Sequence, residues 1–384
     1  MSAQARAVAD PAAVPVAVLL GGPSAEHDVS LVSGRAIAGA LAGRGHPVSG
    51  WCIGLDGAWW RLPAAALDPA IPARAFDDPA GLGATGPFPA AAALAAIAGE
   101  APAPVVFPAL HGPFGEDGEV QALCAAAGLV VCGSGTAASA IGMDKSLFKR
   151  VCGALELPVL PWVEVRSADR AADAAGVRAE LRAFAASLPD PRLIVKPARL
   201  GSSIGVTIVH RPADDADLDA ALAEALRFDD LALVEPYLDH PRELEVSVLG
   251  NHRGDLEVFG PGEVVPMREF YDFVAKYRDD ASRTMERAAL DPALRDDARR
   301  IAGEAFLAIG CAGFARVDFL LAADEMLYVS EINTIPGFTP ISLFPRMCAE
   351  GGYGFADVCS RIVALALAAA AARPGRRLTR ADLP

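Results

Sequence analysis

The sequence has little positive charge, no apolar run long enough for a membrane and no cysteine pattern typical of a metal site. It carries 34 basic and 48 acidic side chains, which gives a formal net charge of -14. Proteins that bind nucleic acid without sequence preference, or an anionic membrane surface, need clustered lysine and arginine, so this balance argues against both partners. The most apolar runs, Ala90–Ala98 and Val363–Ala372, are shorter than the ~18–20 residues that span a bilayer.

The cysteines and the N-terminus point to a cytoplasmic protein. The seven cysteines are odd in number and lack CxxC or zinc-like spacing, so most are expected to be small core residues in a reducing compartment. The first residues, MSAQARAVADPAAVP, contain an acidic residue and prolines where a signal peptide would be basic and then apolar. We expect a short disordered leader. The apolar content of 53% nevertheless indicates folded cores, and 384 residues suggest two or three domains.

The two commonest nucleotide-binding signatures, GxxxxGK[ST] and GxGxxG, are also absent. In their place the segment IVKPARLGSSIGV (194–206) joins an apolar strand pattern to a glycine-rich turn. Lys196 ends the strand, and the backbone N–H groups around Gly201 can turn toward a bound anion. The alternative is an ordinary hairpin loop with a solvated lysine. Lys145, on a predicted helix at 143–155, could reach the same anion but by itself indicates only a surface lysine.

The order of predicted elements divides the chain into three zones. In the first, strands at 14–20, 48–53 and 105–109 alternate with helical patterns, which predicts a parallel sheet. Residues 56–104 have weak periodicity and are expected to form an irregular insertion with one helix. The second zone contains predicted strands at 193–196 and 206–209 and an acidic helix at 214–226. Residues 231–235 lead into the third zone, which contains strands near 245–249, 314–321 and 327–331 and helices near 292–309 and 354–372.

A metal site is predicted on two strands of the third zone. Asp318 lies in FARVDFLL, and Glu331 and Asn333 lie in YVSEINTIPGF. Residues two apart in a strand share one face, so Glu331 and Asn333 point the same way, as do Arg316 and Asp318. Oxygen ligands of this kind suit Mg²⁺ bound together with phosphates. The alternative is a structural network of ion pairs between arginine and the carboxylates.

Seven segments together closely resemble the D-alanine–D-alanine ligases, which are ATP-grasp enzymes of bacterial cell-wall synthesis. The likeness runs in order from about residue 16 to 367. The segments are GGPSAEHDVSLVSG (21–34), ALHGPFGEDGEVQ (109–121), IGMDKS (141–146), VKPARLGSSIGV (195–206), EFYDFVAKY (269–277), FARVDFLL (314–321) and EINTIPGFTPISLFPRM (331–347).

The resemblance implies a mixed α/β and α+β, three-domain ATP-grasp fold. A leader (1–14) would precede an N-terminal parallel α/β substrate domain (15–133), a central ATP-grasp domain (134–234) and a C-terminal catalytic domain (235–384). ATP would lie between the antiparallel sheets of the last two domains. A homodimer in the cytoplasm is the family expectation.

The resemblance also implies a reaction. The carboxylate of one D-alanine would attack the γ-phosphate of ATP to give D-alanyl phosphate, and the amine of a second D-alanine would displace phosphate. The products are D-alanyl-D-alanine, ADP and phosphate, for peptidoglycan synthesis. Two Mg²⁺ ions, or Mn²⁺, would assist. Phosphoryl transfer depends on positioning and charge neutralisation, which explains why no enzyme nucleophile is needed.

Roles carry over by position from the family. Lys145, Lys196, Ser203 and Lys276 match phosphate-binding positions. Glu235 to Leu238 match the adenine hinge, Glu243 the ribose glutamate, and Asp318, Glu331 and Asn333 the metal ligands. Arg316 and the Gly337 N–H match oxyanion stabilisers, while Ser342 and Leu343 match the pocket for the second substrate. Glu26, Ser202 and Tyr277 match a hydrogen-bonded triad that orients the first D-alanine, and His111 lies near that substrate.

Without the family resemblance, three of these residues have simpler interpretations. His111 could end a loop, Tyr277 could be a surface aromatic, and Glu26 could favour a helix dipole. The chain departs from the common pattern at Val274, where a carboxylate often stands, and in the His27-Asp28 pair.

The competing functions are a D-alanine–D-lactate or D-alanine–D-serine ligase on the same scaffold and a non-catalytic nucleotide-binding regulator. Depsipeptide-forming relatives replace the lid tyrosine, so Tyr277 favours the dipeptide product. A regulator would be expected to lose the charged ligands, and all of them are present.

Overall fold

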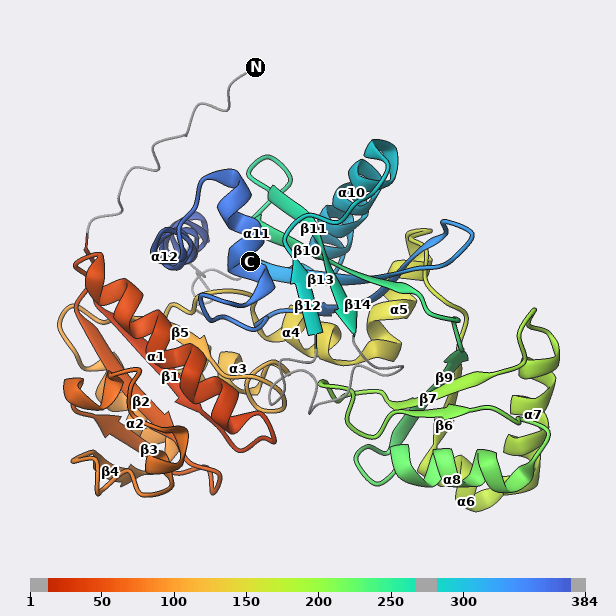
Figure 1. Ribbon diagram of the computed structural model, residues 1–384. Helices are drawn as coiled ribbons and strands as arrows, with labels where there is room; N and C mark the ends of the chain where they lie inside the picture. Colours follow the sequence, from red (N-terminus) through yellow and green to blue (C-terminus); the bar gives the residue numbers. More distant parts are fainter. Residues whose placement is uncertain (1–12, 267–281, 374–384) are drawn as a thin grey trace, which may run out of the picture.

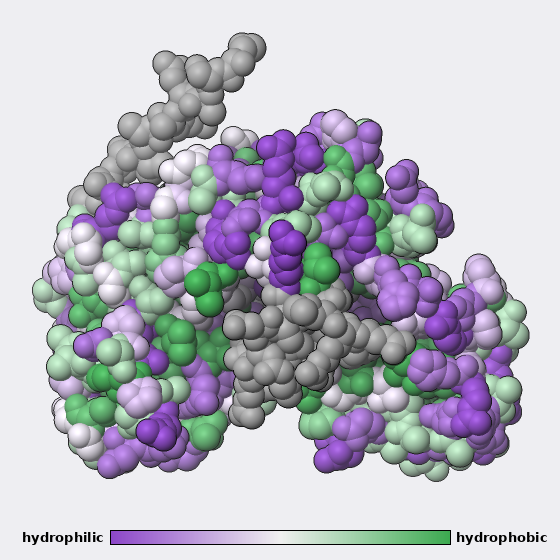
Figure 2. All heavy atoms as spheres, in the orientation of Figure 1, coloured by the Kyte–Doolittle hydropathy of each residue, from purple (hydrophilic) through white to green (hydrophobic). Residues whose placement is uncertain are grey.

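Three β-sheets, each covered by helices, organise the chain (Figure 1). The structure is a computed structural model that describes residues 13–266 and 282–373. On the face shown in Figure 2, hydrophilic side chains are interspersed with hydrophobic ones over all three parts. The predicted three-sheet α/β architecture is confirmed.

The N-terminal sheet is built around three parallel strands. These are β1 (Val16–Gly21), β2 (Val48–Ile53) and β5 (Val105–Ala109), with β1 in the middle. Their burial on both faces explains the continuous apolar runs in the sequence. Helix α1 (His27–Gly43) packs on β1, while α2 (Ala90–Ala98) and α3 (Glu119–Ala126) complete this part.

The expectation for residues 56–104 was right about one helix, α2, but wrong about an irregular insertion. This stretch adds two antiparallel strands, β3 (Trp59–Leu62) and β4 (Thr85–Phe88), so the sheet order is β4-β3-β2-β1-β5. Two short 3₁₀ helices, η1 (Ala64–Leu67) and η2 (Ala73–Asp77), lie between them. Both strands are only four residues long, too short to give a period-two pattern, and it is the burial of Trp59 that anchors them.

The central sheet is antiparallel, with strand order β6-β9-β7-β8. Its strands are β6 (Val163–Arg166), β7 (Leu193–Pro197), β8 (Thr207–Val209) and β9 (Leu231–Pro236). The helices α6 (Ser167–Ala172), α7 (Ala174–Ala186) and α8 (Asp215–Ala225) belong to this part. Helices α7 and α8 each have an aspartate as N-cap. Asp173 accepts from the Gly176 N–H, and Asp214 accepts from the Ala216 N–H.

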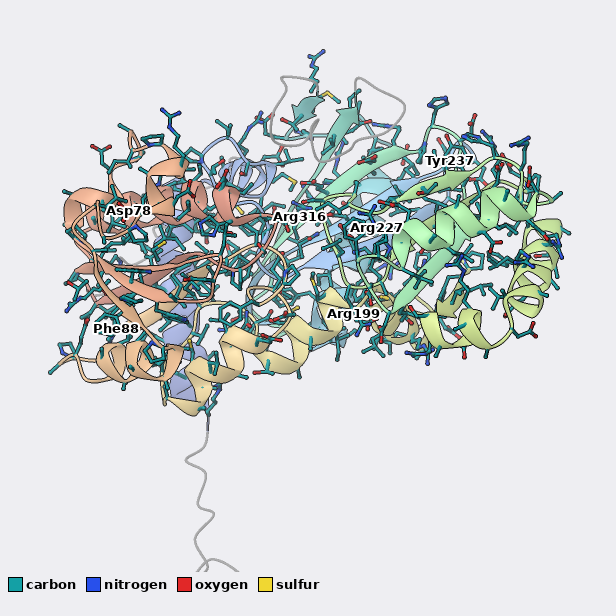
Figure 3. All side chains as sticks on the ribbon, turned by 90° about the horizontal axis from the view of Figure 1, so that it is seen from below. Asp78, Phe88, Arg199, Arg227, Tyr237 and Arg316 are labelled. Carbon is teal, nitrogen blue, oxygen red and sulfur yellow. The ribbon has the colours of Figure 1, made fainter. Side chains whose placement is uncertain are left out.

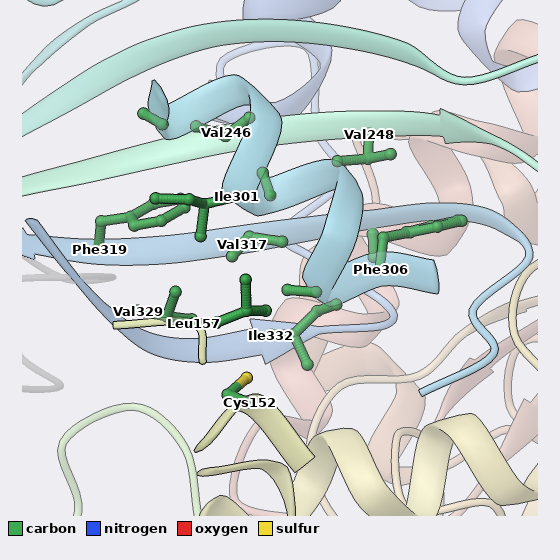
Figure 4. Close-up of a cluster of buried hydrophobic side chains, with 14 of the residues drawn as sticks. Cys152, Leu157, Val246, Val248, Ile301, Phe306, Val317, Phe319, Val329 and Ile332 are labelled. Carbon is green, nitrogen blue, oxygen red and sulfur yellow. The ribbon is translucent and has the colours of Figure 1, made fainter. Parts of the chain in front are cut away.

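The C-terminal sheet is also antiparallel, with strand order β12-β11-β10-β13-β14. The strands are β10 (Arg242–Gly250), β11 (Glu257–Pro266), β12 (Ser282–Met285), β13 (Gly313–Leu321) and β14 (Leu327–Asn333). Helix α10 (Pro292–Ala308), capped by Asp291, packs Ile301 and Phe306 on this sheet (Figure 4).

Two helices join the second and third parts. These are α4 (Thr136–Met143) and α5 (Lys145–Ala154), the latter begun by Asp144, which accepts from the Leu147 N–H. Their buried side chains, such as Cys152, pack into the core of the C-terminal sheet beside Val329 and Ile332 (Figure 4). The predicted central domain, 134–234, includes both helices, although their apolar side chains pack with the C-terminal sheet. The boundary at residue 134 stays a prediction.

The chain ends its described part in α11 (Leu343–Cys348), the 3₁₀ helix η3 (Ala349–Gly351) and α12 (Phe355–Ala372). Among the described helices α12 alone is long and apolar enough to cross a bilayer. Its Val358, Ile362 and Val363 are instead buried in one core with residues of β1 and β5. We therefore interpret α12 as a core helix.

Candidate functional site

One cavity of about 1500 Å³ lies where the three sheets meet, and every predicted site residue in the described part of the chain lines it. Figure 3 shows Arg316 near the middle of the molecule, between the N-terminal and central parts. Lys276 and Tyr277 lie outside the described residues. The predicted residues that line the cavity are Glu26, His111, Lys145, Lys196, Ser202, Ser203, Glu235, Leu238, Glu243, Arg316, Asp318, Glu331, Asn333, Gly337, Ser342 and Leu343.

The glycine-rich turn between β7 and β8 is held in an uncommon backbone conformation. Ser202 and Ser203 have φ angles of 55° and 57°, a region that residues with a Cβ rarely adopt. Such strain persists only where the surroundings enforce it. The base of the turn is anchored by Arg199, whose N–H donates to Asp229 at 2.7 Å. The turn therefore presents its backbone to the cavity in a fixed shape.

The same turn is tied to the N-terminal part of the chain. The Ser202 hydroxyl donates to Glu26 Oε1 at 2.6 Å, and Glu26, at the start of α1, is buried. Two of the three residues predicted as a hydrogen-bonded triad thus meet in the structure, although they are 176 positions apart. The third, Tyr277, lies outside the described residues.

A buried cluster of two lysines and one glutamate lies beside the turn. Glu235 on β9 pairs through Oε2 with Lys196 Nζ at 2.6 Å and through Oε1 with Lys149 Nζ of α5. Burial alone would raise the pKa of Glu235, but the charges of the two lysines hold it at about 2. We call Lys149, Lys196 and Glu235 the lysine cluster; it holds one positive charge in excess.

Three carboxylates lie side by side on the C-terminal sheet. The register places Glu245 of β10 opposite Asp318 of β13, and Asp318 opposite Glu331 of β14. We call these three residues the carboxylate row. Their side chains are only 14%, 17% and 24% exposed. The predicted alignment of Asp318 with Glu331 on neighbouring strands is therefore what the sheet register provides.

Two cations and an amide contact the carboxylate row. Arg316 donates to both Asp318 oxygens at 2.6 Å and lies 3.4 Å from Glu245, and these charges keep the pKa of Arg316 well above its ordinary value despite burial. Asn333 donates to Asp318 at 2.9 Å. Lys145 Nζ lies 3.0 Å from Glu331 and donates to the Leu200 carbonyl at 2.8 Å. Among the described residues, Arg316 and Lys145 are thus the cations in contact with the three carboxylates.

The donor set fits a divalent hard cation. Asp318, Glu331 and Asn333 offer oxygen ligands on one face of adjacent strands, which is the kind of ligand that Mg²⁺ prefers. In the part of the chain described, no three acidic, histidine or cysteine side chains already converge into a closed metal cage. The residues thus suit a cation that is held together with other oxygen ligands such as phosphates.

The turn after β14 forms another wall of the cavity. Ser342 accepts from the Thr339 N–H at 3.0 Å, and an atom added on Gly337 would lie 3.5 Å from the Ser342 oxygen. Gly337 and Ser342 therefore face each other across the turn. Leu343, which begins α11, is buried beside them.

His111 faces the protein with both ring nitrogens. Nδ1 lies 3.0 Å from the Ile335 carbonyl and Nε2 lies 2.9 Å from the Ser33 hydroxyl. Burial lowers the pKa of His111, so the neutral ring with a proton on Nδ1 accounts for both bonds. His111 lines the cavity, but these two bonds leave neither ring nitrogen directed into it. That His111 lies near the first substrate stays a prediction.

Three residues of the site were missed in the sequence: Lys149, Glu116 and Glu245. Glu116 accepts from the Gly112 N–H at 2.7 Å, and burial together with the nearby Glu26 raises its pKa to about 8. A usable signal for Lys149 was present, because the chain contains only four lysines and the other three were already assigned to phosphate. Glu245 follows Glu243 by two residues and so shares its strand face.

Known proteins are similar to this chain in sequence and in fold. The family model described as D-ala D-ala ligase N-terminus matches residues 15–134, and the one described as D-ala D-ala ligase C-terminus matches 151–364. A D-alanine–D-alanine ligase from Solibacter usitatus is 38% identical, over 92% of this chain and 95% of that protein.

Solved structures agree in fold. The D-alanine–D-alanine ligase from Coxiella burnetii has a TM-score of 0.76 at 29% identity, covering 93% of this chain and 94% of that one. The VanG D-Ala:D-Ser ligase from Enterococcus faecalis has a TM-score of 0.77 at 27% identity, with coverage of 92% and 99%.

Proposed function

Because the chain belongs to the D-alanine–D-alanine ligase family, we propose that its cavity holds ATP against the central sheet and two D-alanine molecules against the turn after β14. The enzyme joins two D-alanine molecules to D-alanyl-D-alanine for peptidoglycan synthesis and converts ATP to ADP and phosphate. The observation that carries the assignment of residues is the convergence of distant predicted residues on one cavity.

The phosphates of ATP would be received by the lysine cluster and the glycine-rich turn. Lys196 and Lys145 both line the cavity, and the excess positive charge of the lysine cluster would be offset by a bound anion. The Ser203 backbone adds N–H donors in the turn. Lys276 would join them by family position. The hinge from Glu235 to Leu238 would hold adenine, and Glu243 would hold ribose.

Asp318, Glu331 and Asn333 would hold two Mg²⁺ ions, with Mn²⁺ as a possible substitute. When bound, these ions neutralise the charge that develops on the transferred phosphoryl group. Glu331 would bridge them.

The chain's own residues would orient the two D-alanines. Glu26 and Ser202, with Tyr277 by family position, would orient the first, whose carboxylate takes the γ-phosphoryl group. Ser342 and Leu343 would place the carboxylate of the second. Its amine then attacks the carbonyl carbon, and the Gly337 N–H and Arg316 would stabilise the oxygen that becomes negative.

The alternative acceptors D-lactate and D-serine are less well supported. The VanG ligase shows that a fold of this kind can serve a D-Ala:D-Ser ligase, so the fold alone does not select the acceptor. The curated relatives, however, are D-alanine–D-alanine ligases over more than nine-tenths of the chain. Tyr277 supports the same acceptor, and the charged ligands of the cavity argue against a non-catalytic regulator.

The proposal also includes the domain bounds, the oligomeric state and the cellular compartment, which are carried over from the family. The domains would span 15–133, 134–234 and 235–384, the protein would be a homodimer, and it would act in the cytoplasm. Light scattering of the purified chain tests the dimer, and a monomer at assay concentration would reject it.

The experiment that tests the function is phosphate release from MgATP with D-alanine, L-alanine or D-lactate, with products identified by mass. We expect D-alanyl-D-alanine from D-alanine alone. A depsipeptide from mixed D-alanine and D-lactate at comparable rate would reject the acceptor assignment. Phosphate release that does not depend on D-alanine would reject the use of ATP proposed here.

A further inference from the structure

The turn that carries Gly337 is held from both sides by residues of distant elements. Phe338, next in the chain, is 1% exposed, and its ring centroid lies 5.5–6.0 Å from those of Phe107, Phe314, Phe344 and Phe355. Ile335, two residues before Gly337, bonds through its carbonyl to His111 Nδ1 at 3.0 Å. The short backbone between Ile335 and Phe338 therefore has little freedom to move.

His111 is itself fixed by the first helix of the chain. Its backbone N–H donates to Ser30 at 2.9 Å, its carbonyl accepts from Ser24 at 2.8 Å, and its Nε2 lies 2.9 Å from the Ser33 hydroxyl. Ser30 and Ser33 are fully buried. These bonds make a continuous connection from α1 through His111 to the Ile335 carbonyl, across parts of the chain more than 200 residues apart.

Glu116 supports the connection at the next residue. It accepts from the Gly112 N–H at 2.7 Å, and Gly112 directly follows His111. The backbone that carries His111 is therefore held by Ser24, Ser30 and Glu116, while the ring of His111 bonds the Ile335 carbonyl. The Ile335 peptide cannot rotate without breaking this buried hydrogen bond.

We propose that Ser33 and His111 are positioning residues that hold the turn at Ile335 so that the Gly337 N–H meets the oxygen that becomes negative in the transition state. This rests on the proposed function, in which Gly337 stabilises that oxygen. Donors of this kind act only when fixed in advance at the reacting position. The connection also fixes the distance between the N-terminal part of the chain, where the first D-alanine would bind, and the Gly337 N–H.

This role differs from substrate binding by His111, which the family position implies. If the His111 ring only holds the turn, its loss should weaken stabilisation of the transition state and lower kcat. If the ring binds substrate, its loss should weaken the affinity for D-alanine and raise KM. The two roles therefore separate in kcat and KM.

The test compares four variants: Ser33→Ala, His111→Leu, His111→Asn and the control Ser139→Ala. Ser139 is fully buried on α4, and its hydroxyl has no hydrogen-bond partner among the described residues. The measurements are kcat, KM for D-alanine and for ATP, the unfolding midpoint, and the affinity of a tetrahedral phosphinate analogue of the dipeptide, which reports on transition-state binding.

We expect His111→Leu to lower kcat and analogue affinity about 100-fold, the loss typical of one oxyanion donor, with KM for ATP unchanged. His111→Asn places an amide N–H near the position of Nδ1 and should recover most of this loss. Ser33→Ala should lower both quantities about fivefold, as for one neutral hydrogen bond, and Ser139→Ala should leave both unchanged.

The proposal is overturned if His111→Leu raises KM for D-alanine while kcat stays within twofold, or if His111→Asn is no better than His111→Leu. If His111→Leu does not fold, Ser33→Ala decides, and a wild-type kcat in that variant rejects the proposal. Failure of the proposed function is a separate result, because wild-type enzyme would then form no D-alanyl-D-alanine.

Discussion

The lysine cluster on the central sheet and the carboxylate row on the C-terminal sheet line the same cavity but differ in charge and in depth. The lysine cluster has two cations for one carboxylate, and its Glu235 is 3% exposed. The carboxylate row contains three carboxylates, which lie beside Arg316 and Lys145 among the described residues and are several times more exposed than Glu235. One side is therefore prepared for an anion and the other for a cation.

Helix α5 connects the two clusters. Lys145 and Lys149 are four residues apart and so lie on one stripe of the helix. Lys145 reaches Glu331 of the carboxylate row, whereas Lys149 reaches Glu235 of the lysine cluster. Lys149 does not line the cavity, so under the proposed function it would stay with Glu235 when Lys196 binds a phosphate. The charge of Glu235 would then still be paired.

The largest effect is expected at Glu331, a proposed magnesium ligand. Glu331→Gln removes one carboxylate charge and leaves a weaker, neutral ligand, so the attraction for Mg²⁺ falls. We expect phosphate release to drop about 1000-fold or more, with the unfolding midpoint unchanged. A Mg²⁺ titration of the remaining activity should show a higher half-saturating concentration.

Glu257→Gln is the matched control for this variant. Glu257 is as exposed as Glu331, at 24%, and its ion pair with Arg361 has the same 3.0 Å separation, but it does not line the cavity. Near-normal phosphate release by Glu331→Gln, or an equal loss in both variants, would contradict the assigned role.

Removal of Lys149 tests whether the lysine cluster needs both cations. Lys149→Met leaves Glu235 with Lys196 alone, so the free energy of unfolding should fall by about 3 kcal/mol, as for a broken buried pair. KM for ATP should also rise, because Glu235 then competes with phosphate for Lys196. Urea unfolding and steady-state kinetics measure the two effects.

The double variant Lys149→Met with Glu235→Gln removes the stranded charge as well. It should regain part of the lost stability, and a double-mutant cycle gives the coupling energy. Additive losses would show that the two side chains do not stabilise each other.

Acid should act on the lysine cluster in a defined pH window. The pKa of Glu235 is about 2, below its ordinary value of 4.5, so its contribution to stability is complete above about pH 4.5 and is lost as pH falls toward 2. The shift corresponds to about 3 kcal/mol. Unfolding free energies measured from pH 5 to 2 should fall more steeply for the wild type than for the double variant, and parallel curves would refute this.

The smallest effect is expected at the edge of the carboxylate row. Glu245→Gln weakens a 3.4 Å contact with Arg316, while the two 2.6 Å bonds from Arg316 to Asp318 remain. We expect kcat to change about two- to fivefold, as for a partly exposed ion pair. A loss as large as that of Glu331→Gln would show that Glu245 is a metal ligand or the main support of Arg316.

Much of the fold was predictable because apolar runs report buried strands directly. Residues 48–53 and 105–109 were predicted as strands, and the structure has the same bounds. The strands at 59–62 and 85–88 were missed, because four-residue strands separated by proline-rich turns leave no periodic signal. Helix α5 was predicted at 143–155 and α4 was not predicted. The packing of both on the C-terminal sheet depends on side chains far along the chain.

The site was predictable to the extent that chemistry resides in residue types and their spacing. Asp318, Glu331 and Asn333 could be placed on neighbouring strands because a strand has a period of two. The scarcity of lysine drew attention to Lys149, but its pairing with Glu235 could not be predicted, since the two residues are 86 positions apart. His111 was recognised as a site residue, but which atoms its ring contacts depends on the position of Ile335, 224 residues away.

The sequence by itself determined the inventory of charges: four lysines, the acidic residues of β10, β13 and β14, and a glycine-rich turn. It also determined the family. Only the tertiary structure decided which charges meet. Adjacent turns of α5 send Lys145 to one sheet and Lys149 to another, and α1 reaches the turn of Gly337 through His111. The physical reason is that residue types fix what a side chain can bind, whereas ion pairs and hydrogen bonds require contact within a few ångströms, which only the packing of distant elements supplies.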